Sequence, residues 1–149
     1  MRFVYLAKDE SGIALPELAI SLLVILTVIL GTVEIARLLW TVNALADATR
    51  RGARYAVVNA EDKQAVRDVV VVAANGITPA LDGSADGCSG TSTNSICVDY
   101  DAFDVGTGQV TVSIVNYQFN LAVPFVGGSV TLPPFKTTLT AESAGVAPP

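Results

Sequence analysis

One apolar stretch near the amino terminus limits what this chain can fold into. From Ile13 to Val33 the only charged residue is Glu17, and from Leu18 onward there is none. As a helix this stretch would be about 31 Å long, which matches the hydrocarbon thickness of a bilayer. The rest of the 149-residue chain is too small to enclose it as the buried core of a soluble protein. The sequence therefore predicts a single transmembrane helix over residues 13–33.

A secretory signal peptide is an alternative interpretation of this stretch. Such a peptide has a basic leader, a shorter apolar core and a cleavage site of small residues after that core. Here the leader over residues 1–12 carries Arg2 and Lys8 but also Asp9 and Glu10, so its side chains are neutral overall. The apolar stretch also continues into further helical sequence without such a site. Cleavage after the apolar segment is therefore not expected.

The helical pattern continues beyond Val33 to about Asn59 without a proline or a turn cluster. Apolar and small residues recur there at helical spacing, as in a helix with one buried stripe. The stripe comprises Ile35, Leu38, Leu39, Val42, Leu45, Ala46, Thr49, Ala53, Ala56 and Val57. Two ion pairs at helical spacing, Glu34–Arg37 and Asp47–Arg51, would stabilise its surface. We expect one helix of about 45 residues, apolar on all sides at first and amphipathic afterwards.

A second, shorter helix is expected after this one. Asn59 is a candidate N-cap, with Asp62 three residues further on, and the helix would run to about Asn75 and be closed by Gly76. The valine run at residues 69–72 would also suit a strand, so that alternative stays open.

Beyond a stretch rich in Gly, Ser, Asp and Thr, the apolar residues alternate, which predicts strands. The strands are expected at residues 96–100, 108–123 and 136–143. The alternation slips at Val115 and Asn116, which indicates a bulge or a change of facing. The predicted fold class is thus α+β, with a small antiparallel sheet covered by the amphipathic helix. Residues 34–149 would form a stalk and a globular head.

The two cysteines, Cys88 and Cys97, bracket eight residues where the loop leads into the first expected strand. Because the chain has no histidine, they cannot complete a structural zinc site. A disulfide between them would stabilise the fold by about 2–3 kcal/mol and would require an oxidising compartment. That compartment lies outside the cytoplasm. Two unpaired thiols are the alternative.

Patterns for catalysis or cofactor binding are lacking in this sequence. Without histidine there is no Ser-His-Asp or Cys-His arrangement, and no glycine-rich phosphate-binding motif occurs. Asp82, Ser84, Asp86 and Gly87 begin like a calcium loop, but the twelfth position is Thr93 instead of glutamate. A solvated acidic loop is the simpler interpretation. We expect no enzyme, no metal site and no cofactor.

A basic cluster of Arg50, Arg51 and Arg54 lies in the second half of the long helix. The chain is acidic, with a net charge of −5, and only Tyr55 is an aromatic neighbour of the cluster. Nucleic-acid binding is therefore not expected. Pairing of these arginines with acidic residues of this chain or another fits the pattern better.

Glu17 is the one charge inside the apolar stretch, where an unpaired carboxylate is costly. If the chain were cut after Gly12, Ile13 would carry a free amine and Glu17 would be the fifth residue. The Glu17 carboxylate of one subunit could then pair with the amine of a neighbour in a bundle of such helices. The alternative places Glu17 at the headgroup level, where it complements the helix dipole.

Three segments of the chain resemble the TadE-like pseudopilins of the tight-adherence (Tad) type IV pilus system. They are GIALPELAI at residues 12–20, GTVEIARLLW at 31–40 and ADATRRGARYA at 46–56. The family usually has a proline about six residues after the glutamate. This chain has Leu23 at that position, and it has Pro16 directly before Glu17 instead.

The resemblance implies a type IV pilin-like fold and removal of the leader after Gly12 by a prepilin peptidase. It also implies a single-pass protein of the inner membrane whose carboxy-terminal domain lies outside the cytoplasm. Its partners would be other pilin or pseudopilin subunits and the pilus assembly platform, and its role would be that of a minor pilin that primes or assists assembly. Two other classes stay open: the major subunit of a pilus-like filament, and an uncleaved bitopic protein that presents a small binding domain.

Overall fold

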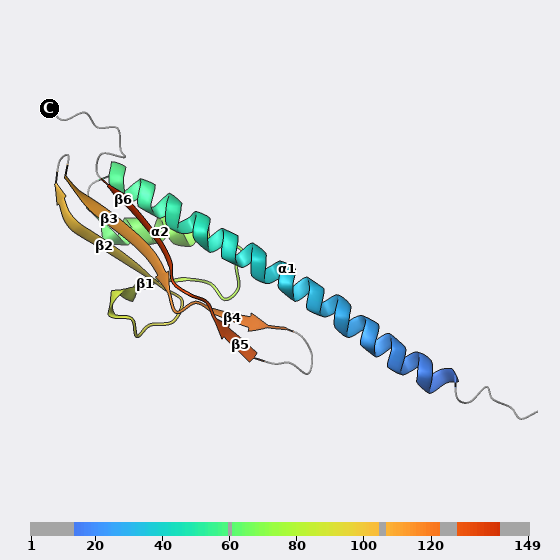
Figure 1. Ribbon diagram of the computed structural model, residues 1–149. Coiled ribbons are helices and arrows are strands. Elements are labelled where there is room, and N and C mark those ends of the chain that lie inside the picture. The colour runs from blue at the N-terminus through green and yellow to red at the C-terminus, as the bar shows by residue number, and fades with distance from the viewer. Residues whose placement is uncertain (1–13, 60, 105–106, 123–127, 141–149) are drawn as a thin grey trace, which may run out of the picture.

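A computed structural model describes residues 14–59, 61–104, 107–122 and 128–140 of the chain. Figure 1 shows a long helix that runs past a small head at one end and extends alone at the other. The described elements are, in chain order, helices α1 (Ala14–Val58) and α2 (Lys63–Ala73), strand β1 (Asp82–Asp86), a short 3-10 turn (Gly87–Ser89), and strands β2 (Ser95–Asp104), β3 (Thr107–Val115), β4 (Gln118–Leu121), β5 (Gly128–Thr131) and β6 (Phe135–Thr140). The predicted α+β fold, with one long helix, one short helix and a carboxy-terminal sheet region, is confirmed.

Helix α1 is one continuous helix of 45 residues. Pro16 lies in its first turn, where the missing N–H of proline has no intrahelical partner to lose. Asn59 closes the other end, because its backbone N–H and its side-chain amide both donate to the carbonyl oxygen of Tyr55, at 3.1 and 2.9 Å. The helix therefore continues from the apolar stretch into the head without a break, as predicted.

The N-cap of α2 is Asp62, and the prediction that Asn59 caps this helix is wrong. The Asp62 carboxylate accepts hydrogen bonds from the N–H groups of Gln64 and Ala65, at 2.9 and 3.1 Å. Asn59 is already engaged in ending α1. The valine run at residues 69–72 is helical, which decides between the two alternatives left open by its composition.

The main sheet has four strands in the order β1-β2-β3-β6. Strands β2, β3 and β6 pair antiparallel, whereas β1 pairs parallel with β2. The sequence of β1, DGSAD, was expected to be part of a loop because it lacks an apolar alternation. It is a strand because its backbone pairs with β2, at Asp82 with Ser95 and at Asp86 with Ile96.

Strand β3 ends at Val115, and the chain then leaves the main sheet for an antiparallel hairpin of β4 and β5. Asn116 turns the chain with a left-handed φ of 52°, a conformation that asparagine tolerates. Its side-chain amide donates to the carbonyl oxygen of Gly90 at 2.8 Å. The slip in the alternation is therefore a change from one sheet to another and not a bulge.

The hydrophobic core lies between the main sheet and the two helices. Helix α1 packs along β3 and β6, and α2 packs on β1 and β2. The largest fully buried apolar side chains are Leu45, Val66, Val70, Ile96, Val98, Val110, Val112, Ile114, Tyr117 and Phe119. Of the predicted stripe, Ile35 and Leu39 are instead exposed, at 62% and 58%. The core contacts of α1 therefore begin later in the helix than the periodicity suggested.

Gly52 lets α1 approach α2 closely. A Cβ atom at this position would overlap the side chain of Val70 and would lie 3.4 Å from Cγ1 of Val112. Small residues flank it on the same face, since Ala48, Ala53 and Ala56 are all fully buried. The second half of α1 thus presents a surface without bulky side chains, onto which α2 and the sheet can pack.

Candidate assembly segment and its junction with the head

The first half of α1 is exposed and apolar. Among the described residues α1 is the one helix that is long and apolar enough to cross a membrane. Leu18, Ile20 and Leu22 are each more than 60% exposed, and no described part of the head covers them. A helix that is apolar on all sides and covered by nothing in its own chain is suited to lipid or to other helices.

The hydroxyl groups of the two threonines inside this apolar half are satisfied locally. The hydroxyl of Thr27 donates to the carbonyl oxygen of Leu23 at 2.8 Å, and that of Thr32 donates to Val28 at 2.9 Å. Such bonds to the preceding turn let a hydroxyl enter an apolar environment without an unpaired donor. They remove one obstacle to placing this part of α1 in hydrocarbon.

Glu17 lies in the first turn of α1 and its side chain is exposed. Gly12 and Ile13, the predicted cleavage residues, lie outside the described part of the chain. A carboxylate in the first turn faces the positive end of the helix dipole, and at this position it is also available to a group from another chain. Its pairing with a neighbour's amine stays a prediction.

Glu34 and Arg37 mark the place where α1 meets the head. The two side chains form the predicted ion pair, with 2.7 Å between Arg37 Nη1 and Glu34 Oε1. The sequence did not indicate that Glu34 would be only 7% exposed, or that the Arg37 guanidinium would lie 5.4 Å from the ring centre of Phe119 in β4. Helical spacing predicts the pair within α1, but the contact with Phe119 depends on where the head folds back.

The second oxygen of Glu34, Oε2, is buried and has no hydrogen-bond partner in the described part of the chain. A buried carboxylate with a single partner depends strongly on that partner, because removing it would leave an uncompensated charge. Arg37 therefore contacts both Glu34 in its own helix and Phe119 in the hairpin, and so links α1 to β4.

Tyr117 anchors the start of the hairpin beneath this junction. It is 1% exposed, and its hydroxyl donates to the carbonyl oxygen of Pro79 at 2.8 Å. Burial raises the pKa of the Tyr117 hydroxyl, and the positive charge of Arg37 partly opposes that shift. The tyrosine therefore stays neutral and keeps its hydrogen bond at ordinary pH. Nothing in the local sequence pattern pointed to this contact.

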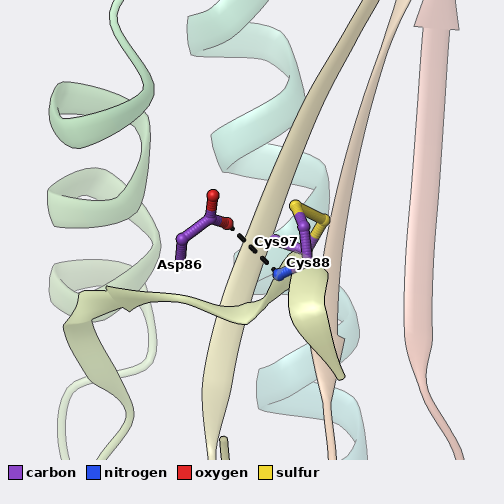
Figure 2. A group of neighbouring side chains, drawn as sticks. All are labelled: Asp86, Cys88 and Cys97. Atoms are coloured by element: carbon purple, nitrogen blue, oxygen red, sulfur yellow. Dashed lines mark hydrogen bonds between the residues drawn. A yellow bond between two sulfur atoms is a disulfide. The ribbon is translucent and has the colours of Figure 1, made fainter. Parts of the chain in front are cut away.

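Cys88 and Cys97 are joined by a disulfide that ties the 3-10 turn to β2, with 4.6 Å between the two Cα atoms. Figure 2 shows the Asp86 carboxylate beside this bond, where it accepts a hydrogen bond from the backbone N–H of Cys88 at 3.2 Å. Asp86 and the two sulfur atoms lie close enough to share a metal ion. The sulfurs are bonded to each other, however, and only a thiolate is an effective metal ligand.

The residues that resemble the start of a calcium loop lie in β1 and at the start of the 3-10 turn. The Asp82 carboxylate accepts hydrogen bonds from the N–H and the hydroxyl of Ser84, at 2.9 and 2.7 Å. The Asp86 carboxylate lies 4.0 Å from the guanidinium of Arg67 on α2. Both carboxylates are thus engaged with groups of the chain itself, and the stretch forms a strand and a 3-10 turn instead of the expected loop.

All three arginines of the basic cluster on α1 are exposed. Arg51 pairs with Asp47 at 2.8 Å, as the spacing predicted. Arg50 and Arg54 are exposed on the helix surface. Among the described residues, ion pairing inside the chain therefore accounts for one of the three arginines.

Comparison with known proteins supports the assignment of the amino-terminal region. The family model described as TadE-like protein matches residues 12–54, a segment that starts at Gly12 and ends inside the head-packing part of α1. No significant match was found among curated proteins or among solved structures. Over residues 12–54 the chain is similar to the TadE-like protein family, which confirms the resemblance seen in its sequence.

Proposed function

We propose that this chain is a minor pilin of a Tad-like pilus that is inserted in the inner membrane, processed after Gly12, and used to prime or assist fibre assembly. The observation that carries the proposal is the TadE-like match over residues 12–54, which includes the exposed apolar half of α1. The match supports a general association with the Tad pilus. The specific role in priming or assembly is the part that we add.

The division of the chain follows from this role. Residues 1–12 are the leader on the cytoplasmic side, residues 13–33 are the membrane-spanning half of α1, and residues 34–149 form the stalk and head outside the cytoplasm. The disulfide between Cys88 and Cys97 supports this orientation, because such a bond persists in an oxidising compartment. Basic residues flank both ends of the apolar stretch, so their distribution does not indicate which end is cytoplasmic. The orientation is therefore argued from the disulfide.

Glu17 has the central part in assembly. After cleavage the amine of Ile13 would become the end of the mature chain, and the Glu17 carboxylate would lie one turn further along α1. In a bundle of such helices the Glu17 carboxylate of one subunit pairs with the amine of its neighbour. Hydrocarbon favours that pairing because a lone charge is costly there, so the pair also fixes the stagger between helices. The prepilin peptidase, neighbouring pilins and the assembly platform are the partners that this scheme requires.

The variant Glu17→Ala tests this proposal. We expect it to insert in the membrane as the native chain does, because it only removes a charge from an apolar helix. We also expect it to be lost from fibres sheared off the cell surface, which quantitative immunoblotting of the sheared and membrane fractions measures.

Asp47→Ala is the matched control, since it removes an exposed carboxylate of the same helix far from the amino terminus, and its surface pair with Arg51 contributes little to stability. It should still enter fibres. Normal recovery of Glu17→Ala in the sheared fraction would contradict the pairing scheme. Absence of the native chain from every sheared fraction would contradict a role in the fibre, and native levels equal to those of the main fibre protein would make it a major subunit.

A further inference from the structure

The hairpin of β4 and β5 is unlike the rest of the head in where it lies and in what it exposes. Figure 1 shows the two strands beside the middle of α1, with the end at which Leu121 pairs with Gly128 directed toward the apolar half of the helix. The contact between Arg37 and Phe119 fixes the level of the hairpin along α1. The hairpin therefore lies where the helix would leave the membrane.

The distance from the apolar span supports this placement. Arg37 follows the last residue of the span, Val33, by four positions, which corresponds to about 6 Å along a helix. The headgroup layer on each side of a bilayer is about 5–8 Å thick. With the span ending at Val33, as proposed above, the Phe119 ring beside Arg37 and Val130 that pairs with Phe119 would lie at the level of the headgroups.

The hairpin also lacks the charges that usually protect an exposed strand. All four residues of β5 are exposed, including Val130 at 43%. From Val105 to Phe135 the sequence contains no Asp, Glu, Lys or Arg, so both strands of the hairpin are without charged residues. An exposed strand in water normally carries charges that prevent edge-to-edge association. The lack of such charges makes this strand compatible with a contact at a membrane surface.

The neighbouring residues of α1 are those that favour a membrane interface. Arg37 is partly exposed and carries the positive charge at this level, and Trp40 is 54% exposed one turn further from the span. Tryptophan and arginine are enriched at the level of lipid headgroups, where an apolar body and a polar group are both accommodated. The helix and the hairpin thus both present residues suited to lipid headgroups at about the same level along α1.

We propose that the β4–β5 hairpin is a second membrane contact, which lies in the headgroup layer beside α1 while the subunit is anchored. This inference rests on the membrane anchoring of α1 that is part of the proposed function. The partner is the phospholipid surface itself. A hairpin in contact with lipid would hold the head close to the bilayer and restrict its rotation about α1 before the subunit is taken into a fibre.

Tryptophan fluorescence in lipid vesicles tests this contact on the full chain. In a Trp40→Phe background, a single tryptophan is introduced by Val130→Trp or Ser129→Trp, both exposed positions of β5. Val72→Trp is the matched control, because Val72 is 74% exposed on α2, the helix that packs beside Gly52 far from the span. Ile25→Trp reports on insertion of α1. The vesicles carry nitroxide-labelled phospholipids, with the label either on the headgroup or deep in the acyl chain.

We expect the headgroup nitroxide to quench Val130→Trp and Ser129→Trp several-fold more strongly than Val72→Trp, and the deep nitroxide to quench Ile25→Trp. Far-UV circular dichroism and retention of the disulfide verify the fold of each variant. If both hairpin probes are quenched no more than Val72→Trp while Ile25→Trp is quenched, the inference is wrong and the anchoring stands. The same lack of quenching is expected if the natural partner of the hairpin is another protein instead of lipid. If Ile25→Trp is not quenched, the anchoring is wrong and the inference fails with it.

Discussion

At the scale of single residues, Glu34 shows how a charge is tolerated where the span meets the head. Its carboxylate is almost fully buried, and Arg37 supplies its one hydrogen bond among the described residues. The same guanidinium lies over Phe119, so one side chain joins the helix to the hairpin. Burying the pair is costly in itself, but breaking it is costlier because one charge would remain without a partner.

The variant Arg37→Met tests this dependence. It keeps the length of the side chain but removes the charge, so Glu34 is left buried and unpaired. We expect the free energy of unfolding to fall by about 2 kcal/mol, which is less than for a fully buried pair because Arg37 is partly exposed. Denaturant unfolding of the full chain in detergent micelles measures the change.

The double variant Glu34→Gln with Arg37→Met is the control for this measurement. It removes both charges, so it should recover part of the stability that Arg37→Met loses. A double variant that is less stable than Arg37→Met by the full effect of Glu34→Gln would show that the two side chains act independently.

At the scale of elements, the packing of α1 on α2 depends on a glycine in a helix where glycine is otherwise unfavourable. Gly52 is buried between Val70 and Val112, whereas a Cβ atom added at Gly31, in the apolar half of the same helix, would meet no atom within 4 Å. The lack of a side chain at Gly52 is therefore required for packing, whereas at Gly31 a side chain would meet none of the described residues.

The pair Gly52→Ala and Gly31→Ala separates these two situations. Both gain the helix propensity of alanine, so their difference reports the packing alone. We expect Gly52→Ala to be less stable than Gly31→Ala by about 1–3 kcal/mol, because the added methyl group forces α2 away from α1. Thermal unfolding of the head, followed by near-UV circular dichroism, measures both variants. Equal melting temperatures would show that α2 can shift without loss.

Elements with a strong local pattern could be predicted from the sequence, and those held by distant contacts could not. The continuous α1, the ion pair of Asp47 with Arg51, and the strand pattern of β3 follow from periodicity and spacing. Strand β1 has no pattern of its own and depends on backbone pairing with β2. The end of β3 at Asn116 depends on a hydrogen bond to Gly90, far away in the sequence.

The same distinction applies to the candidate site. Glu17 stands out in the sequence because it is a charge in an apolar run, and Arg37 could be paired with Glu34 by spacing alone. The contacts of Arg37 with Phe119 and of Tyr117 with Pro79 join segments far apart in the chain. They form only once the hairpin is placed beside α1, so periodicity carries no signal for them.

At the scale of the whole molecule, the chain joins an apolar helix segment, which is suited to lipid or to other helices, to a head that has its own hydrophobic core. The exposed apolar half of α1 requires lipid or other helices around it, and the head has its own core and a disulfide. Both parts belong to or pack on one continuous helix, so the apolar segment and the head keep a fixed spacing along α1. In the proposed role, the subunit would move from the bilayer into a fibre as one piece once its amino terminus is free to pair.

The amino terminus of the mature protein tests the central claim most directly. The chain is expressed with its prepilin peptidase, purified from the membrane and analysed by intact mass and amino-terminal sequencing. We predict a mature chain that begins at Ile13, and a full-length chain when the peptidase is absent or when Gly12→Leu is introduced. An intact Met1 on the membrane-inserted protein in the presence of active peptidase would contradict the claim and would indicate an uncleaved bitopic protein.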